Sequence, residues 1–214
     1  DKLPASGDSI TYSITAPLED TKWVLAAKDS SIAYGSKQGD GGSLWVSSMG
    51  TVINRLGMFD DTIAFDANGT FHNLMGSNTW LEKWQGVNED GCGTPVYPHD
   101  GSISATWSLD TINHTLTIDG VGAHLGLAKV YNDGEFTSSL QANAIASIQY
   151  EVIDLNDKSL TVDIFNGSGW WRFQYKKVEN PVGINVIESR FTNKAENILR
   201  FVQWLGIDKK TINR

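Results

Sequence analysis

The segment "NGSGWWRFQYKKV" at 166–178 places two tryptophans directly after a Gly-Ser-Gly turn. In a β-strand, neighbouring side chains point to opposite faces, so Trp170 and Trp171 cannot both enter the same core. The alternate residues after Trp171 are aromatic, whereas those after Trp170 are the polar residues Arg172 and Gln174. The pattern therefore predicts that Trp171 faces the core and that Trp170 is exposed to solvent.

An exposed indole beside hydrogen-bonding side chains is typical of sugar binding, because sugar rings have apolar faces and polar edges. The segment "NTWLEKWQG" repeats this composition, with Trp80 and Trp84 four residues apart and Glu82 between them. A purely structural interpretation is also open, in which Trp170 covers one end of the fold or packs under a terminal helix.

Acidic residues gather in the loop-rich middle of the chain, which raises the alternative of an enzyme. A glycosidase needs two carboxyl groups about 5–5.5 or 6.5–9.5 Å apart. The candidate acid–base pairs are Glu82 with Asp100, Asp61 with Glu89, and His99 with Tyr97. None of these pairs has a local signature, and ordinary surface solvation also explains such residues.

Metal and cofactor motifs are sparse. "NEDG" at 88–91 is rich in oxygen ligands, as a Ca²⁺ site would be, but it lacks the spaced pattern of a calcium loop. The four histidines lack the spacing of a zinc site. We therefore expect no metal and no cofactor, with calcium as the one ion that this composition allows. The single cysteine, Cys92, cannot form an internal disulfide and is expected to be a small buried side chain.

Period-2 alternation and frequent turn signals dominate residues 21–178 and predict antiparallel strands. Hairpin turns are expected at Asn68-Gly69, near Asn113, at Asn156-Asp157 and at 166–169. Sequential hairpins place consecutive strands side by side. The fold class is therefore all-β, an antiparallel meander that forms a lipocalin-like barrel or a two-sheet sandwich.

The alternating pattern of the sequence ends after Val178. Ile198, Phe201, Val202 and Leu205 follow the spacing of an amphipathic helix. We expect an antiparallel β domain at 1–180, followed at 181–214 by a linker and a C-terminal helix that packs on the β domain.

The bulk composition excludes some partners. The 214 residues carry a formal net charge of −8, which would repel the phosphate backbone of nucleic acid. No apolar stretch approaches the roughly 20 residues of a membrane span. The chain begins at Asp1 without a signal segment, which indicates a processed or trimmed chain.

The Trp-bearing first strand and the closing aromatic strand resemble bacterial lipocalin-like domains over residues 22–178. Several unbroken segments also resemble a β-rich domain of marine bacterial proteins associated with family-16 β-1,3-glucanases and algal polysaccharide use. These segments are "LGMFDDTIAFDANGTF", "TWLEKWQG", "GCGTPVYPHDGS", "AHLGLAKVYN" and "GWWRFQY". The resemblance implies an accessory domain that acts on glycan, secreted, attached to the cell surface or periplasmic, beside a catalytic module.

The leading hypothesis is a non-catalytic carbohydrate-binding module for a β-glucan or another algal polysaccharide. Its expected ligand-binding residues are Trp170, Trp80, Trp84, Arg172, Gln174, Glu82, His99 and Asp100. One alternative is a small glycoside hydrolase or lyase, with Glu82, Asp100 and His99 as the catalytic candidates. Another is a lipocalin-like carrier, which predicts a large closed pocket for an apolar ligand.

Overall fold

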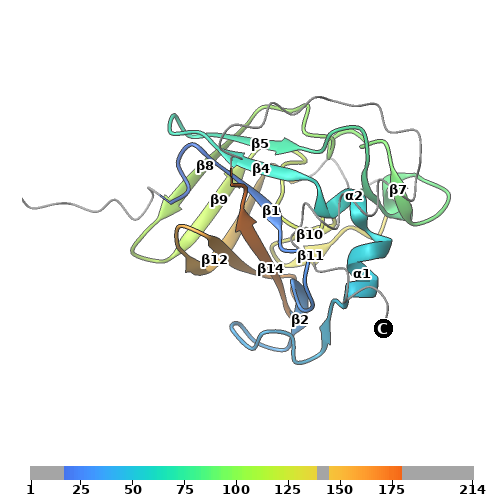
Figure 1. The fold of residues 1–214 in the computed structure, drawn as a ribbon, viewed down its shortest axis with the longest axis horizontal. Coiled ribbons are helices and arrows are strands. Elements are labelled where there is room, and N and C mark those ends of the chain that lie inside the picture. Colours follow the sequence, from blue (N-terminus) through green and yellow to red (C-terminus); the bar gives the residue numbers. More distant parts are fainter. Residues whose placement is uncertain (1–16, 139–144, 180–214) are drawn as a thin grey trace, which may run out of the picture. The chain divides into compact units, whose positions relative to one another are not determined.

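Eight antiparallel strands form a closed barrel in the computed structural model, which describes residues 17–138 and 145–179 (Figure 1). In spatial order the strands are β1 (Thr21–Leu25), β4 (Thr62–Phe65), β5 (Thr70–Leu74), β8 (Ala105–Asp110), β9 (Thr115–Asp119), β12 (Ser147–Leu155), β13 (Ser159–Phe165) and β14 (Trp170–Lys177). Pairing between β1 and β14 closes the ring. The predicted all-β meander is confirmed, and it is a barrel.

The expected hairpins join consecutive strands of this barrel. Gly69 has a φ of 85° in the turn between β4 and β5, a conformation that glycine adopts without steric cost. Trp107 pairs with Ile118 and Leu109 with Leu116 between β8 and β9. Turns at 156–157 and 166–169 connect β12 to β13 and β13 to β14.

Alternating side chains of the strands fill the barrel. Trp23 is paired with Ile63, and both are buried. Phe173 is also fully buried, as its parity in β14 predicts. The side chains with under 2 % exposure include Trp23, Tyr150, Phe65, Phe71, Phe173, Leu116, Ile118, Leu125 and Leu160.

Two short strands extend the sheet beyond the barrel. β2 (Ile32–Gly35) pairs with the N-terminal half of β14, and β3 (Trp45–Val46) pairs with β2. The loop between them is held by Asp40, whose carboxylate accepts hydrogen bonds from Gly42 N and Ser43 Oγ. These bonds lower the pKa of Asp40 well below its usual range.

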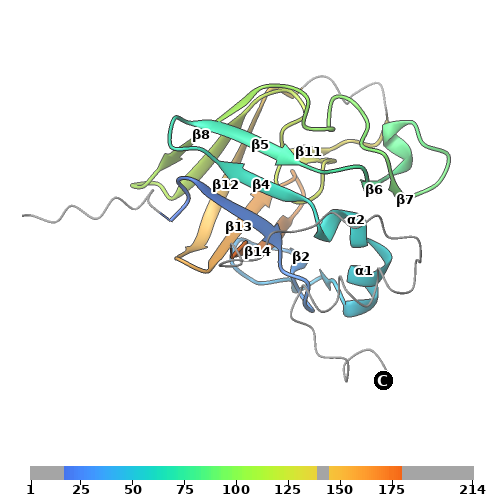
Figure 2. The same cartoon turned by 45° about the horizontal axis from the view of Figure 1, so that its top comes forward.

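Two short helices and a small hairpin lie at one end of the barrel, on the right in Figure 2. Helices α1 (Met49–Asn54) and α2 (Leu56–Phe59) lead into β4. The hairpin of β6 (Thr79–Leu81) and β7 (Gly91–Gly93) encloses the 3₁₀ turn η1 (Lys83–Gln85). A second small hairpin is formed by β10 (Val130–Tyr131) and β11 (Gly134–Glu135).

The segment 122–127 enters this end of the barrel and is fixed by inward-facing polar side chains. Asn73 Nδ2 donates to the His124 carbonyl at 2.8 Å. Leu125 N donates to Tyr150 Oη at 2.8 Å, and Gly126 N donates to Tyr175 Oη at 2.6 Å. Gly126 has a φ of 72°, and a Cβ atom there would lie 2.2 Å from the Phe173 ring. Only glycine therefore fits this position.

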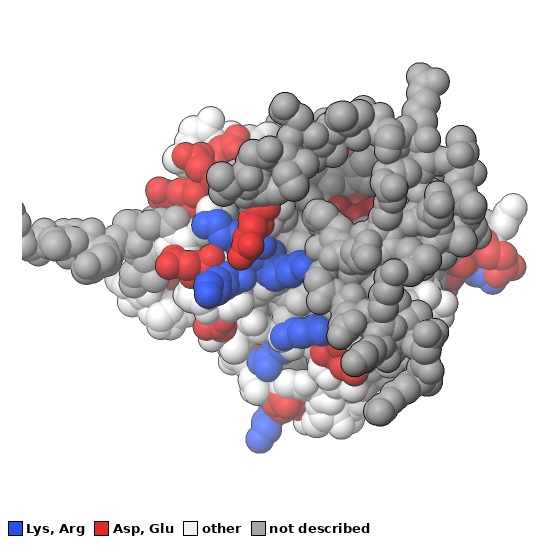
Figure 3. Space-filling model, in the orientation of Figure 1, with Lys and Arg blue, Asp and Glu red and all other residues white. Residues whose placement is uncertain are grey.

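The C-terminal helix and the boundary at residue 180 lie outside the described residues. Within the described ranges, none of the helices combines the length and the apolar character that crossing a membrane requires. On the face shown in Figure 3, basic and acidic side chains lie side by side, so the visible described surface presents mixed charge.

Candidate functional site

Three charged side chains meet at the loop-covered end of the barrel, and we refer to Glu82, Lys129 and Glu135 as the charged ridge. Lys129 Nζ lies 3.8 Å from Glu82 Oε1 and 3.4 Å from Glu135 Oε2. The side chains are only 14 %, 23 % and 25 % exposed, in the order Glu82, Lys129 and Glu135. The ridge is therefore partly desolvated, which strengthens its electrostatic interactions relative to bulk water.

Two local structures position the ridge. Glu82 precedes η1 and forms a capping box, in which Glu82 N donates to Gln85 Oε1 at 3.0 Å. Lys129 and Glu135 flank the turn of the β10–β11 hairpin, where Asp133 has a φ of 66°. Phe136 N donates to the Lys129 carbonyl at 2.8 Å and continues this pairing by one residue.

One oxygen of each ridge carboxylate has a hydrogen-bond donor. Trp84 Nε1 donates to Glu82 Oε2 at 3.0 Å. Trp171 Nε1 and Asn166 Nδ2 both donate to Glu135 Oε1, each at 2.6 Å. The other two oxygens, Glu82 Oε1 and Glu135 Oε2, are the ones nearest to Lys129. These bonds fix the orientation of both carboxylates.

An aromatic row lies beside the ridge and consists of Trp45, Tyr34 and Trp171, on β3, β2 and β14. Trp171 pairs with Tyr34 and Tyr34 with Trp45 across the strands. The ring centroids of Trp171 and Tyr34 are 4.9 Å apart, and those of Trp171 and Trp45 are 6.0 Å apart. Trp45 is 39 % exposed. Lys129 Nζ lies 5.5 Å from the Trp171 ring centroid, which connects the row to the ridge.

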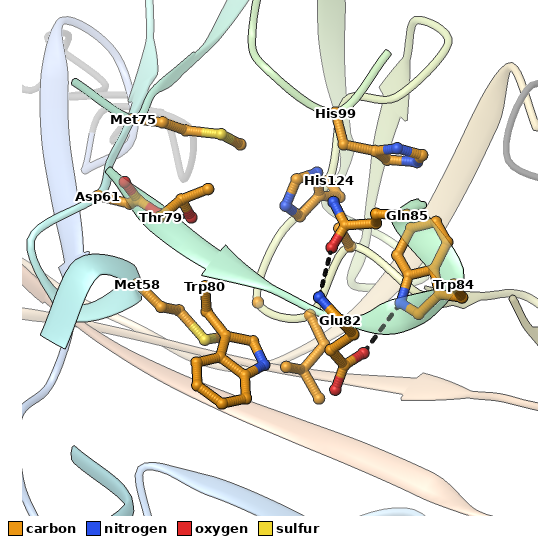
Figure 4. Close-up of a pocket in the computed structure, with 13 residues that line it drawn as sticks. Met58, Asp61, Met75, Thr79, Trp80, Glu82, Trp84, Gln85, His99 and His124 are labelled. Atoms are coloured by element: carbon orange, nitrogen blue, oxygen red, sulfur yellow. Dashed lines mark hydrogen bonds between the residues drawn. The ribbon is translucent and has the colours of Figure 1, made fainter. Parts of the chain in front are cut away.

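A small recess lies on the other side of Glu82 (Figure 4). Its volume is about 20 Å³, enough for one or two water molecules. Thr79 Oγ1 donates to Asp61 Oδ2 at 2.5 Å, whereas the buried Asp61 Oδ1 has no partner among the described residues. Burial raises the pKa of Asp61 to about 8, so this carboxyl is protonated at neutral pH.

Two histidines form another part of the recess wall. The ring centroids of His99 and His124 are 5.9 Å apart, and His99 packs edge-on against Trp84 at 5.1 Å. Burial lowers the pKa of His99 to about 3, and it also lowers the pKa of His124. Both imidazoles are therefore neutral at physiological pH.

The separation of the ridge carboxylates bears on the glycosidase hypothesis. The two ridge oxygens nearest to Lys129 each lie within 3.8 Å of its ammonium group, so they are less than about 8 Å apart, a separation compatible with glycosidase chemistry. A glycosidase also needs a protonated carboxyl as its general acid. Burial raises the pKa of Asp61 as this role would need, but Asp61 lines a recess too small for a sugar ring.

The structure brings together only half of the residues predicted for the site. Trp80, Glu82, Trp84 and His99 all line the recess. Trp84 and His99 are buried, and Arg55 lies 4.5 Å above the Trp80 ring. Of the predicted ligand-binding residues, Glu82 is therefore the one that belongs to the charged ridge.

The other predicted ligand-binding residues make structural contacts elsewhere. Trp170 is half-buried against Phe165, with ring centroids 5.3 Å apart, so the prediction that it is bare to solvent is wrong. Arg172 Nε donates to Asp163 Oδ1 at 2.7 Å. Gln174 Nε2 donates to the Ser30 carbonyl at 2.7 Å.

The remaining loop candidates form no shared acid–base site. Asp100 Oδ1 accepts hydrogen bonds from Ser102 N and Ser102 Oγ within its own turn. Glu89 pairs with Lys83 at 2.8 Å on the surface. Tyr97 is 65 % exposed, whereas His99 is buried.

The structure shows where Cys92 lies and how the possible metal-binding side chains are distributed. Cys92 is exposed, which contradicts the prediction that it is buried. Its strand, β7, lies in the outer two-stranded sheet, where a small side chain does not reach the core. Within residues 17–138 and 145–179, no three His, Cys, Asp or Glu side chains are grouped so that they could hold a metal ion.

Sequence reasoning did not identify Lys129, Glu135, Trp45 or Tyr34 as site residues. The signal for the first two was the short "KVYNDGE" segment, whose Asn-Asp-Gly turn brings a cation and a carboxylate together. Trp45 and Tyr34 lie at the ends of a glycine-rich loop, and only the β2–β3 pairing shows that they are neighbours.

Comparisons with known proteins find solved structures that match the chain with low TM-scores and low sequence identity. No family model and no curated protein sequence matches the chain. A lipocalin-like protein from Bacteroides uniformis has a TM-score of 0.35 and 14 % identity, covering 76 % of this chain and 99 % of its own. A protein from Bacteroides eggerthii has a TM-score of 0.35 and 11 % identity, covering 74 % and 98 % respectively.

These values carry no argument about function, and the barrel is established by the strand pairing itself. Nothing in the comparisons links the chain to marine bacteria or to family-16 glucanases. That part of the resemblance stays a prediction.

Proposed function

We propose that this protein is a non-catalytic carbohydrate-binding protein that recognises a polysaccharide such as a β-glucan. The binding surface consists of the aromatic row and the charged ridge. The observation that carries the proposal is the exposed Trp45 ring, which packs edge-on against Trp171 beside the charged ridge. Aromatic faces and convergent polar groups match the two chemistries of a sugar.

The proposal retains the expected ligand but moves the site. The predicted platform, Trp170, is replaced by Trp45 and its row, and the polar contacts are assigned to the ridge rather than to Arg172 and Gln174. The secreted or surface-attached accessory role stays part of the proposal, because an algal polysaccharide would be met outside the cell.

Affinity gel electrophoresis in gels containing soluble polysaccharides tests the proposal. We expect at least one neutral polysaccharide to retard the protein and Trp45→Ala to abolish most of that retardation. Trp170→Ala is the matched control, because Trp170 packs against Phe165 outside the proposed surface. Equal mobility in every gel would contradict the proposal.

The closed barrel also fits the second candidate, a carrier of a small apolar ligand. Its interior is occupied by the segment 122–127, and the two hollows that adjoin this segment hold about 20 Å³ each. An apolar ligand would have to displace Leu125 and Leu127. Titration with a fluorescent apolar dye tests this candidate, since saturable binding to the native protein at one site would favour it over the surface site.

A further inference from the structure

We propose that the charged ridge binds two hydroxyl groups on neighbouring carbons of one uncharged sugar residue. The ligand is then a neutral polysaccharide whose internal residues keep such a pair free. This inference rests on the proposed function and narrows the class of its ligand. It uses Glu82, Lys129 and Glu135.

The ion pairs of the ridge are long. A hydrogen bond between an ammonium and a carboxylate typically spans about 2.7–2.9 Å. The distances from Lys129 Nζ to Glu82 Oε1 and Glu135 Oε2 are 3.8 and 3.4 Å. Within the described part of the chain, no hydrogen bond accompanies these ion pairs. An ammonium has three N–H donors, so Lys129 can donate to an incoming oxygen.

The two carboxylates are constrained but not saturated. Trp84 occupies Glu82 Oε2, while Trp171 and Asn166 occupy Glu135 Oε1. Among residues 17–138 and 145–179, no other side chain donates a hydrogen bond to the oxygens that face Lys129. The ridge therefore presents an acceptor, a donor and a second acceptor in a row, on side chains whose orientation is already fixed.

A hydroxyl group matches each half of this row, because it donates one hydrogen bond and accepts another. One hydroxyl donates to Glu82 Oε1 and accepts from Lys129, and the second donates to Glu135 Oε2 and accepts from the same ammonium. Hydroxyls on neighbouring carbons are close enough to share one ammonium. Hydrogen bonds to charged groups are stronger than neutral ones, and such chains reinforce one another.

The charge of the ridge excludes acidic sugars. Two carboxylates face one ammonium that is already ion-paired with both. A uronate or sulfate group would be desolvated beside Glu82 and Glu135, and the nearby cations already interact with these carboxylates, Lys129 with both and Arg55 with Glu82. Like charges in such an interface select against the wrong ligand.

Affinity gels with three polysaccharides separate the parts of this proposal. Glucomannan is neutral and β-1,4-linked, so its internal residues keep free hydroxyls at the second and third carbons. Alginate is also 1,4-linked and keeps that pair, but every residue carries a carboxylate. Laminarin is neutral, but its β-1,3 linkage uses the middle oxygen and leaves no neighbouring pair inside the chain.

We expect glucomannan to retard the protein with an apparent Kd about tenfold or more below that for laminarin, and alginate to leave it unretarded. Glu82→Gln and Glu135→Gln conserve shape but remove charge, and each is expected to weaken glucomannan binding about tenfold. Lys158→Met, at the exposed β12–β13 turn, is the matched control and is expected to bind as the wild type does.

Equal retardation by laminarin would overturn the requirement for neighbouring hydroxyls, and equal retardation by alginate would overturn the exclusion of charge. Either result leaves carbohydrate binding intact. No retardation by any of the three, or by the wider neutral panel used for Trp45→Ala, would remove the proposed function itself. Thermal unfolding of each variant distinguishes loss of binding from loss of fold.

Discussion

Two regions of the barrel each pair a basic side chain with carboxylates, but the ion pair is tightly hydrogen-bonded in one region and long in the other. On the outer face of β13 and β14, Arg172 binds Asp163 through two hydrogen bonds of 2.7 and 2.8 Å. Gly39 N adds a third bond to Asp163 at 2.9 Å, and Asp163 is almost fully buried. At the charged ridge, Lys129 stays 3.4 Å or more from both of its carboxylates.

The difference separates a structural ion pair from one that is available to a ligand. The Asp163 carboxylate has three protein donors, so it holds the loop 36–43 against the barrel. In the part of the chain that the structure describes, two carboxylate oxygens and the ammonium of the ridge lack a short hydrogen bond to another side chain, and an exposed tryptophan lies nearby. Residue types such as Trp, Arg and Gln in the sequence cannot tell a structural ion pair from an available one. That difference depends on which hydrogen-bond donors the fold places beside each carboxylate.

The largest expected effect concerns the structural pair. Arg172→Ala leaves the Asp163 carboxylate buried without its cation, and removing one partner of a buried ion pair typically costs about 3–5 kcal/mol. We expect the urea midpoint to fall accordingly, while any cooperatively folded fraction still binds polysaccharide. A loss below about 1 kcal/mol would show that the outer pair is no more structural than the ridge.

The next effect concerns Asp61, the carboxyl beside the ridge that has no cation. Its pKa is raised to about 8 by burial, whereas an unfolded Asp titrates near 3.9. The folded protein holds this proton between those values, so the free energy of unfolding falls as pH rises towards 8 and then levels off. Between pH 6.5 and 8 we expect a loss of about 1.6 kcal/mol.

Denaturant unfolding across that pH range measures the effect of Asp61. His99, whose pKa is lowered to about 3, contributes the opposite slope, but only below the pKa of an unfolded His near 6.5. Asp61→Asn is the control, because it retains an acceptor for Thr79 and cannot titrate. A profile as steep in this variant as in the wild type would refute the assignment.

A smaller effect is expected at the aromatic row. Trp45→Ala removes an exposed ring, so we expect a Kd for glucomannan that is about tenfold higher, or about 1.4 kcal/mol, with little change in stability. Isothermal titration calorimetry measures the change. If Trp170→Ala weakened binding more than Trp45→Ala, the outer face would be the binding surface after all.

The smallest expected effect on folding sharpens the contrast with Arg172. Lys129→Met keeps an unbranched side chain, and the long ion pairs that it removes are partly exposed. We expect the free energy of unfolding to fall by less than it does in Arg172→Ala, because the ridge ion pairs are longer than those of Arg172. Thermal and urea unfolding measure this change. A cost comparable to that of Arg172→Ala would identify Lys129 as a structural residue.

The strands were predictable from sequence because their signals are local. The Asn68-Gly69 turn and the alternation around Trp107 and Leu116 are complete within one hairpin each. The parity of β14 was also predictable, and Phe173 and Tyr175 face the core as expected.

The candidate site was less predictable because it depends on contacts between distant segments. Trp170 has the outward parity, but Phe165 on the neighbouring strand covers it. Glu82 and Glu135 are more than fifty residues apart in the chain and meet only through Lys129. Trp171 was assigned to the core, yet its indole nitrogen leaves the core to bind Glu135.

The most direct measurement is a titration of the ¹⁵N-labelled protein with glucomannan oligosaccharides, followed through the indole N–H signals of its eight tryptophans. We predict that the signals of Trp45 and Trp171 shift with saturation, that Lys129→Met abolishes the shifts, and that the signal of Trp170 stays in place. Saturable shifts confined to Trp170, or shifts unaffected by Lys129→Met, would contradict this account.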